Sequence, residues 1–265
     1  MKKIILSLGA ITAVLVGASM FAAFEAHVVN VTARIENALS VPVDPITFGT
    51  VFPQEQLDRR LPIELSRSFI TEQNADDVNY IIRQKPKCGV TSENGQVLVG
   101  PTWTGHVVTF QNADGTWSYR IDCDTDKPKG LELGTGQTAG LLPSLCQYLS
   151  KHELTLDLND EDVDNDGGLA SFHQPFTIDA NGNVVWNDVK GRLAKSENDT
   201  ADMWNIDLKV PCFGGFCAQD WATFVAANDG DNNANPADYV QNISNEHKVF
   251  GCNLWVEVTG VSRFN

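Results

Sequence analysis

Hydrophobic and polar residues alternate along much of this chain with a period of two. The longest run of this kind spans residues 24–41 (FEAHVVNVTARIENALSV), where the odd positions from Val29 to Val41 are mostly apolar and the even positions mostly polar. A period of two places alternate side chains on opposite faces of a β-strand, whereas a helical pattern repeats every 3.6 residues. The run therefore predicts a long amphipathic strand near the N-terminus.

Three later segments give the clearest further strand patterns. Residues 78–84 (VNYIIRQ) are apolar on both faces, which predicts a deeply buried strand. Residues 106–111 and 116–122 predict a hairpin, because the Asn112–Gly115 sequence between them favours a turn. Strict alternation in residues 203–210 predicts a half-buried strand with Trp204 on its core face.

Weaker patterns complete the prediction of the fold. We expect strands at 46–52, 61–69, 152–158 and 252–261, a polar turn at 53–60, an insertion at 159–202, and a short helix or a loop at 221–227. Leu254, Val256 and Val258 are expected to form the last core face. About ten short strands with turns between them and little helical periodicity predict an all-β, jelly-roll-like antiparallel sandwich with loop insertions. We expect a single domain at residues 42–265.

The first 23 residues have the composition of a cleaved signal peptide. Two lysines precede an apolar core at residues 4–16, and small residues follow at 17–23. The alternative is an uncleaved anchor, for which the apolar run is short. Cleavage between Ala23 and Phe24 predicts a secreted protein, extracellular or on the cell surface, with no stable membrane association.

The charge balance excludes several classes of partner. The formal net charge is -15, which opposes binding to nucleic acids and to anionic membranes. Such acidity is compatible with a surface protein that stays dissolved until it assembles.

The cysteines predict disulfide bonds. An even number in an exported chain favours up to three bridges, with the connectivity left open: the candidates are Cys88, Cys123, Cys146, Cys212, Cys217 and Cys252. Cys212 with Cys217 is the first choice, because the two glycines of CFGGFC allow a tight loop. The absence of any CxxC pair disfavours a zinc site.

One acidic segment has the spacing of a calcium loop. Asp162, Asp164 and Asp166 precede Gly167 at alternate positions, as in the first half of such a loop, but position 173 is histidine where the bidentate glutamate would stand. The two interpretations are a calcium site and a solvated acidic loop. Asp229 and Asp231 offer the same choice, and no other cofactor is expected.

No catalytic motif is found, so we expect no enzyme. His152 and Glu153 match half of a zincin motif, but position 156 is leucine and the segment alternates as a strand. No pair of carboxylates stands out for acid and base catalysis. Some tryptophans could stack on sugars, and Trp186, Trp221 and Trp255 are the candidates for exposure.

Several segments share features with one family of proteins. They are the Ala22-Ala23-Phe24 junction, the strand that follows it, and the segments FGTVFPQEQLDRRLPIELSRSF, YIIRQKPKC, DLKVPC and FGCNLWVEVTG. Together they give the chain a resemblance to the TasA/camelysin family of secreted fibre-forming proteins. It does not extend to 124–150, 159–202 and 213–250. The chain also departs from the family in its six cysteines and in Phe21, three residues before the expected cut, which leaves the cleavage point open.

The resemblance implies processing by a dedicated signal peptidase and assembly of the chain with itself. The strand at 24–41 would insert into the sheet of a neighbouring copy, as fibres or pili on the cell surface or in a biofilm matrix. Its core-facing donor residues would be Val29, Val31, Ala33, Ile35 and Leu39.

Two other functions remain open at this point. A monomeric, secreted, calcium-dependent carbohydrate-binding module would pair the N-terminal strand within its own chain. A hydrolase on a jelly-roll scaffold is the third possibility, although the fold alone does not give a function.

Overall fold

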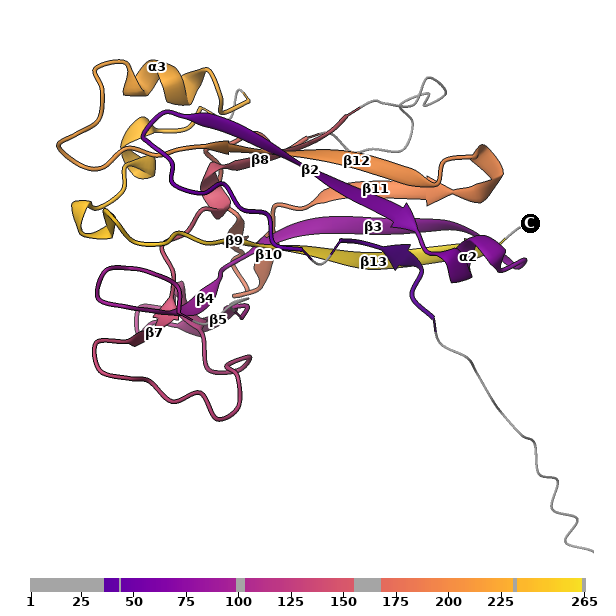
Figure 1. The fold of residues 1–265 in the computed structure, drawn as a ribbon, viewed down its shortest axis with the longest axis horizontal. Helices are drawn as coiled ribbons and strands as arrows, with labels where there is room; N and C mark the ends of the chain where they lie inside the picture. The colour runs from indigo at the N-terminus through magenta and orange to yellow at the C-terminus, as the bar shows by residue number, and fades with distance from the viewer. Residues whose placement is uncertain (1–35, 43, 99–102, 155–167, 231–232, 264–265) are drawn as a thin grey trace, which may run out of the picture. The chain divides into compact units, whose positions relative to one another are not determined.

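The computed structural model describes residues 36–42, 44–98, 103–154, 168–230 and 233–263 (Figure 1). Residues Glu36–Asn265 form one compact unit. This unit is mostly β-structure, and its sheets are antiparallel, as the alternation predicts. No helix in the described ranges is long and apolar enough to cross a bilayer.

The first sheet has four strands in the order β1-β2-β12-β8. Their bounds are Leu39–Ser40 for β1, Gln56–Leu65 for β2, Ala201–Lys209 for β12 and Leu149–Glu153 for β8. The register between β2 and β12 pairs Leu61 with Trp204, so the apolar faces of both strands point to the same side. The predicted strand at 203–210 is confirmed.

The second sheet has three strands in the order β11-β3-β13. Their bounds are Val189–Ala194 for β11, Ala75–Lys85 for β3 and Asn253–Arg263 for β13. β3 lies in the centre and is buried along most of its length, which confirms the prediction for residues 78–84. The pairing of β13 with β3 is interrupted by irregularities after Val258 and after Val261.

The two sheets lie one above the other and share a hydrophobic core (Figure 1). Both sheets contribute fully buried side chains to it: Ile63, Trp204, Ile206 and Leu208 from the first, and Val78, Tyr80, Ile82 and Leu193 from the second. Polar contacts also cross the core, because Gln84 of β3 donates a hydrogen bond to the carbonyl of Leu149 in β8 at 3.1 Å.

Smaller elements flank these sheets. They include the strand pairs β4 (Cys88–Thr91) with β7 (Thr138–Leu141), β5 (His106–Gln111) with β6 (Trp117–Asp122), and β9 (Phe176–Ile178) with β10 (Val184–Trp186). The predicted hairpin at 106–122 is therefore confirmed. A second apolar cluster lies beneath β4, around Cys88, Val90 and Trp103.

The helices are short. They are α2 (Arg67–Thr71), α3 (Trp221–Ala226) and the 3-10 turns η1 (Cys146–Tyr148), η2 (Lys195–Glu197), η3 (Pro236–Tyr239) and η4 (Ile243–Asn245). Ser66 caps α2 by accepting a hydrogen bond from the amide of Phe69 at 3.1 Å. For residues 221–227, where a helix and a loop were both open, the structure has a helix.

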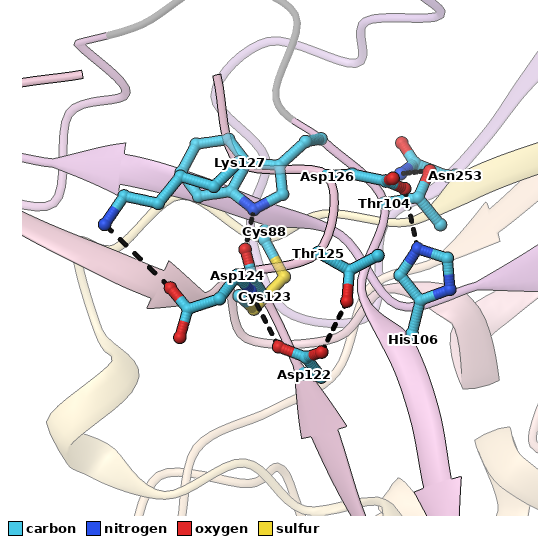
Figure 2. The surroundings of a disulfide bond; sticks show 11 residues. Cys88, Thr104, His106, Asp122, Cys123, Asp124, Thr125, Asp126, Lys127 and Asn253 are labelled. Carbon is cyan, nitrogen blue, oxygen red and sulfur yellow. Dashed lines mark hydrogen bonds and ion pairs between the residues drawn. A yellow bond between two sulfur atoms is a disulfide. The ribbon is translucent and has the colours of Figure 1, made fainter. Parts of the chain in front are cut away.

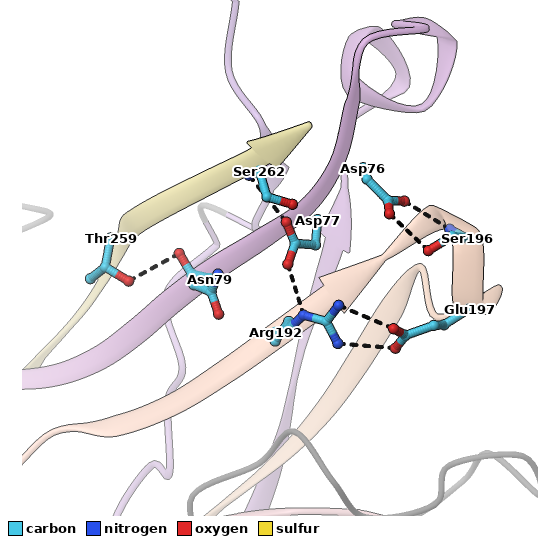
Figure 3. A network of polar contacts seen from close by, with 8 residues as sticks. All are labelled: Asp76, Asp77, Asn79, Arg192, Ser196, Glu197, Thr259 and Ser262. Atoms are coloured by element: carbon cyan, nitrogen blue, oxygen red, sulfur yellow. Dashed lines mark hydrogen bonds and ion pairs between the residues drawn. The ribbon is translucent and has the colours of Figure 1, made fainter. Parts of the chain in front are cut away.

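A charged network holds the second sheet together at one end (Figure 3). Arg192 of β11 donates to Asp77 of β3 at 2.9 Å, and to both carboxylate oxygens of Glu197 at 3.0 and 3.1 Å. Asp77 in turn accepts a hydrogen bond from the amide of Ser262 in β13 at 3.1 Å. One arginine is therefore linked to all three strands of the sheet.

Five predictions of the fold are wrong. The strand expected at 61–69 ends at Leu65, because Ser66 caps helix α2 at Arg67–Thr71. Residues 46–52 form no strand, although Ile46, Phe48 and Val51 pack against the core. The expected polar turn at 53–60 includes the first half of β2. The expected insertion at 159–202 contains β11, which belongs to the second sheet. Val258 is exposed rather than buried in the core, because β13 is an edge strand.

Candidate functional site

The seam between β1 and β2 is the part of the body that bears on the N-terminal strand. Leu39 pairs with Leu65 and Ser40 pairs with Glu64. β2 has ten residues, and β1 covers only the last two of them. Along Gln56–Ile63 the outer edge of β2 has no strand partner among the described residues.

β13 provides a second open edge. It pairs with β3 on one side, and within the part of the chain that the structure covers no strand pairs with its other side. Val258 and Val261 are 40% and 52% exposed along this strand. An unpaired edge presents backbone amide and carbonyl groups that an added strand can satisfy.

The predicted donor strand is described only at its end. Leu39 lies in β1 and packs against the core of its own chain. The cleavage residues Ala23 and Phe24 and the donor residues Val29, Val31, Ala33 and Ile35 lie outside the described residues. Because Leu39 pairs within its own chain, the proposed donor segment ends before this residue.

All six cysteines form disulfides: Cys88 with Cys123, Cys146 with Cys252, and Cys212 with Cys217. The predicted Cys212–Cys217 bridge is confirmed. The other two pairings were left open by the sequence. The Cys146–Cys252 bond joins η1 to the residue that precedes β13, and so ties the second sheet to the segment before β8.

The Cys88–Cys123 bond is surrounded by a polar turn that hydrogen bonds to itself (Figure 2). The Asp122 carboxylate accepts hydrogen bonds from the Thr125 hydroxyl at 2.6 Å and the Asp124 amide at 2.8 Å, and these two contacts lower its pKa. His106 pairs with Asp126 at 2.7 Å. The carboxylates of Asp122 and Asp126 are therefore already bonded to Thr125, Asp124 and His106. The turn that carries them lies next to the disulfide.

Tyr80, Asp202 and Trp204 form a polar cluster between the two sheets. The Tyr80 hydroxyl donates to Asp202 and accepts from the indole N–H of Trp204 at 2.7 Å. Burial raises the pKa of Asp202 well above its usual range, and the neighbouring Glu153 carboxyl adds to the effect. Asp202 is only 4% exposed, so Asp202 and Glu153, which sequence reasoning did not pair, do not form an open catalytic pair.

A second buried polar cluster surrounds Lys151 of β8. Within the described chain its ammonium nitrogen is buried without a hydrogen-bond partner, and burial lowers the pKa of Lys151 to about 7. His173 places one ring nitrogen 2.7 Å from the carbonyl oxygen of Ala170 and the other 2.7 Å from the side-chain oxygen of Gln84. Burial and the nearby Lys151 lower the pKa of His173 to about 4. Since a neutral imidazole carries one N–H, one of these contacts lacks a proton.

The remaining candidate sites give a mixed result. His152 and Glu153 lie on strand β8, which agrees with rejecting a zincin helix. Asp162, Asp164, Asp166 and Asp231 lie outside the described residues, so the calcium interpretation is not tested. Asp229 accepts a hydrogen bond from the amide of Ala234 at 2.9 Å. Across the described positions, no group of three or more potential ligands could hold a metal ion.

The tryptophans divide into core and surface residues. Trp204 is buried in the core, as predicted. Trp221 was expected at the surface but is only 6% exposed, because it stacks on Phe224 inside the core cluster. Trp255 is 42% exposed and Trp186 is half-buried. Sequence reasoning missed Phe176, which the fold places in contact with both Trp186 and Tyr119.

Comparison with known proteins identifies no relative: no family model, no curated protein and no solved structure matches the chain. Its function therefore has to be argued from the geometry described above.

Proposed function

We propose that this chain is an exported structural subunit of jelly-roll type that assembles with itself into extracellular fibres. In this proposal, residues 24–35 of one copy add as a strand to an open sheet edge of the next copy, after removal of the signal peptide. Backbone hydrogen bonds would give the affinity, and the alternating side chains would set the register.

The direction of β1 is the observation that carries the proposal. In the antiparallel register, each step from Leu39 toward the N-terminus is a step from Leu65 toward the C-terminus. Ile35 would then face Phe69, which lies in α2 and not in a strand. If this register continued, residues 24–35 would run past the end of β2, so β2 of the same chain is not their partner in this proposal, and we place the partner edge on another copy.

The open edges supply the acceptor. β2 along Gln56–Ile63 and β13 along its eleven residues are both unpaired by strands on one side among the described residues. β13, with eleven residues, is nearly as long as the twelve-residue segment 24–35, whereas the free part of β2 has eight residues and could pair with only part of it. Val29, Val31 and Ile35 would each gain about 1.5–3 kcal/mol on full burial, before the cost of ordering the strand.

The disulfides support export. Bonds of this kind form and persist in oxidising compartments, and are rare in reducing ones. All six cysteines are paired in the structure. This agrees with the signal-peptide composition of residues 1–23.

The test compares two substitutions in the same strand. A chain starting at Phe24, produced under oxidising conditions, should form fibres visible by negative-stain electron microscopy. Val31→Asp should abolish them, because it places a charge on the apolar face. Thr32→Asp is the matched control on the polar face and should leave assembly intact.

Deletion of residues 24–35 gives a second readout by size-exclusion chromatography. The truncated chain should remain monomeric. Fibres of normal appearance from that truncation, or equal loss of fibres with both aspartate substitutions, would refute assembly through this strand.

A further inference from the structure

A line of aromatic rings and cations crosses five strands on one side of the molecule. Tyr119 of β6 contacts Phe176 of β9 with ring centroids 4.9 Å apart, and Phe176 contacts Trp186 of β10 at 5.2 Å. The Arg83 guanidinium lies 5.3 Å from the centroid of the Trp186 ring. Trp255 of β13 pairs with Arg83 across the strands. We call Tyr119, Phe176, Trp186, Arg83 and Trp255 the aromatic strip.

The strip faces outward from the second sheet. Along β3, Tyr80, Ile82 and Gln84 are buried in the core, so Arg83 between them points to the opposite face. At the two ends of the strip, Tyr119 is 52% and Trp255 is 42% exposed. Solute can therefore reach the rings, which are not core residues.

Contacts with neighbouring side chains hold the aromatic strip in place. The Trp117 ring packs so closely under the turn that joins β9 to β10 that a Cβ on Gly182 would come within 2.5 Å of it. Arg83 donates to both carboxylate oxygens of Asp188, at 3.0 and 2.8 Å. The Lys85 ammonium lies 3.6 Å from the centroid of the Trp255 ring. Rings fixed in this way lose little entropy when a ligand binds.

The polar groups along the strip determine which ligand fits it. Two cations, Arg83 and Lys85, stand beside the carboxylates of Asp188 and Glu257, with Glu257 3.5 Å from Arg83, and the carboxylate of Asp126 also lies near Lys85. The strip therefore carries no net positive charge, and the chain as a whole carries -15. A polyanion would be repelled by the chain and would find no net positive surface at the strip. A neutral ligand rich in hydroxyl groups finds aromatic faces for its C–H surfaces, and both donors and acceptors for its hydroxyls.

We propose that the aromatic strip binds a neutral polysaccharide, with Tyr119 and Trp255 stacking on sugar rings and Arg83, Asp188 and Glu257 hydrogen bonding to hydroxyl groups. This activity goes beyond fibre formation and does not depend on it. A subunit with such a surface would attach a glycan along the side of the sandwich.

The test is affinity electrophoresis in gels that contain hydroxyethylcellulose, xylan or glucomannan, with polygalacturonate as the anionic comparison. The protein used is the chain from Phe24 carrying Val31→Asp, so that assembly adds no avidity. At least one neutral polymer should retard it, and polygalacturonate should not. Titration with the matching hexasaccharide then gives the dissociation constant.

Substitutions at the two exposed ends of the aromatic strip distinguish polysaccharide binding by the strip from binding at another surface. Trp255→Ala and Tyr119→Ala should each weaken binding at least fivefold, and circular dichroism checks that both remain folded. Phe110→Ala is the matched control: Phe110 is 45% exposed on the same hairpin as Tyr119, but its register opposite Ser118 puts it on the other face. It should change the affinity less than twofold.

Three results would overturn the proposal. They are no retardation by any of the neutral polymers, retardation by polygalacturonate alone, and affinities for Trp255→Ala and Tyr119→Ala equal to that of the Phe110→Ala control.

Discussion

The hydroxyl of Tyr80 in β3 donates a hydrogen bond to the carboxyl group of Asp202 in β12, and so links the two sheets within the core. The same hydroxyl accepts a hydrogen bond from Trp204. Burial raises the pKa of Asp202, because an isolated carboxylate is poorly solvated there. The contact therefore stabilises a polar group that the core would otherwise exclude.

Removing the Tyr80 hydroxyl should destabilise the sandwich. We expect Tyr80→Phe to lower the free energy of unfolding by about 1–3 kcal/mol, because a buried acceptor loses its donor. Urea unfolding at pH 7 measures this value. The double variant Tyr80→Phe with Asp202→Asn should cost less than the sum of the single variants, and strict additivity would show that the two groups are not coupled.

Lys151 should make stability depend on pH. Its pKa is lowered to about 7 in the folded chain from the ordinary value of 10.5, so the unfolded chain binds more protons between these two values. Stability should therefore rise with pH across that window, and below about pH 7 the full cost of the buried ammonium should apply. Lys151→Met should be more stable than wild type at pH 6.5, by a few kcal/mol in order of magnitude.

The advantage of Lys151→Met should shrink as the pH approaches 9.5, which urea unfolding at a series of pH values can follow. Lys209→Met is the control, because Lys209 lies on the neighbouring strand β12 and bonds to Gln56 at the surface. An advantage that stays constant with pH would contradict a titrating buried lysine.

The disulfides should contribute unequally to stability. Cys146 and Cys252 are separated by 106 positions, whereas Cys212 and Cys217 are separated by 5. The loop-entropy relation predicts losses of about 5 and about 2 kcal/mol on replacing each pair by alanine. Denaturant unfolding of the two double variants, with the other bridges intact, measures both values. Equal losses would indicate that loop entropy does not govern these bonds.

Replacing Arg192 by lysine should lower the stability of the fold. Its fork contacts both Asp77 and Glu197, and a single ammonium cannot reproduce this geometry. We expect Arg192→Lys to lower the free energy of unfolding by about 1–2 kcal/mol, and to speed hydrogen exchange at the Ser262 amide, which bonds to Asp77. Lys190→Arg, on the same strand, is the control and should change neither measurement.

Periodicity alone was enough to predict two kinds of strand. In β12 the two faces differ in polarity, and β3 is buried on both faces. β11 escaped notice because Gly191 stands where an apolar side chain would continue the pattern, and the Tyr80 ring occupies the space of its Cβ. The first half of β2 was missed because an edge strand exposes polar residues on both faces.

Residues 46–52 show the opposite error. Ile46, Phe48 and Val51 pack against the core while Phe52 is exposed, and the backbone of this segment finds no partner strand among the described residues. Periodicity reports which side chains are buried and cannot report whether a partner strand is available. The aromatic strip was beyond sequence reasoning for a related reason, since Tyr119, Phe176 and Arg83 meet only after separate hairpins dock.

The central position of β3 has a consequence for when the chain can fold during its synthesis. β3 is made early, at Ala75–Lys85, but its two neighbours begin only at Val189 and Asn253. Until they are synthesised, a nascent apolar strand is left with both of its sides unpaired, which invites wrong association. Folding of this chain should therefore be slow and largely post-translational, and should benefit from a chaperone that holds the unfolded chain.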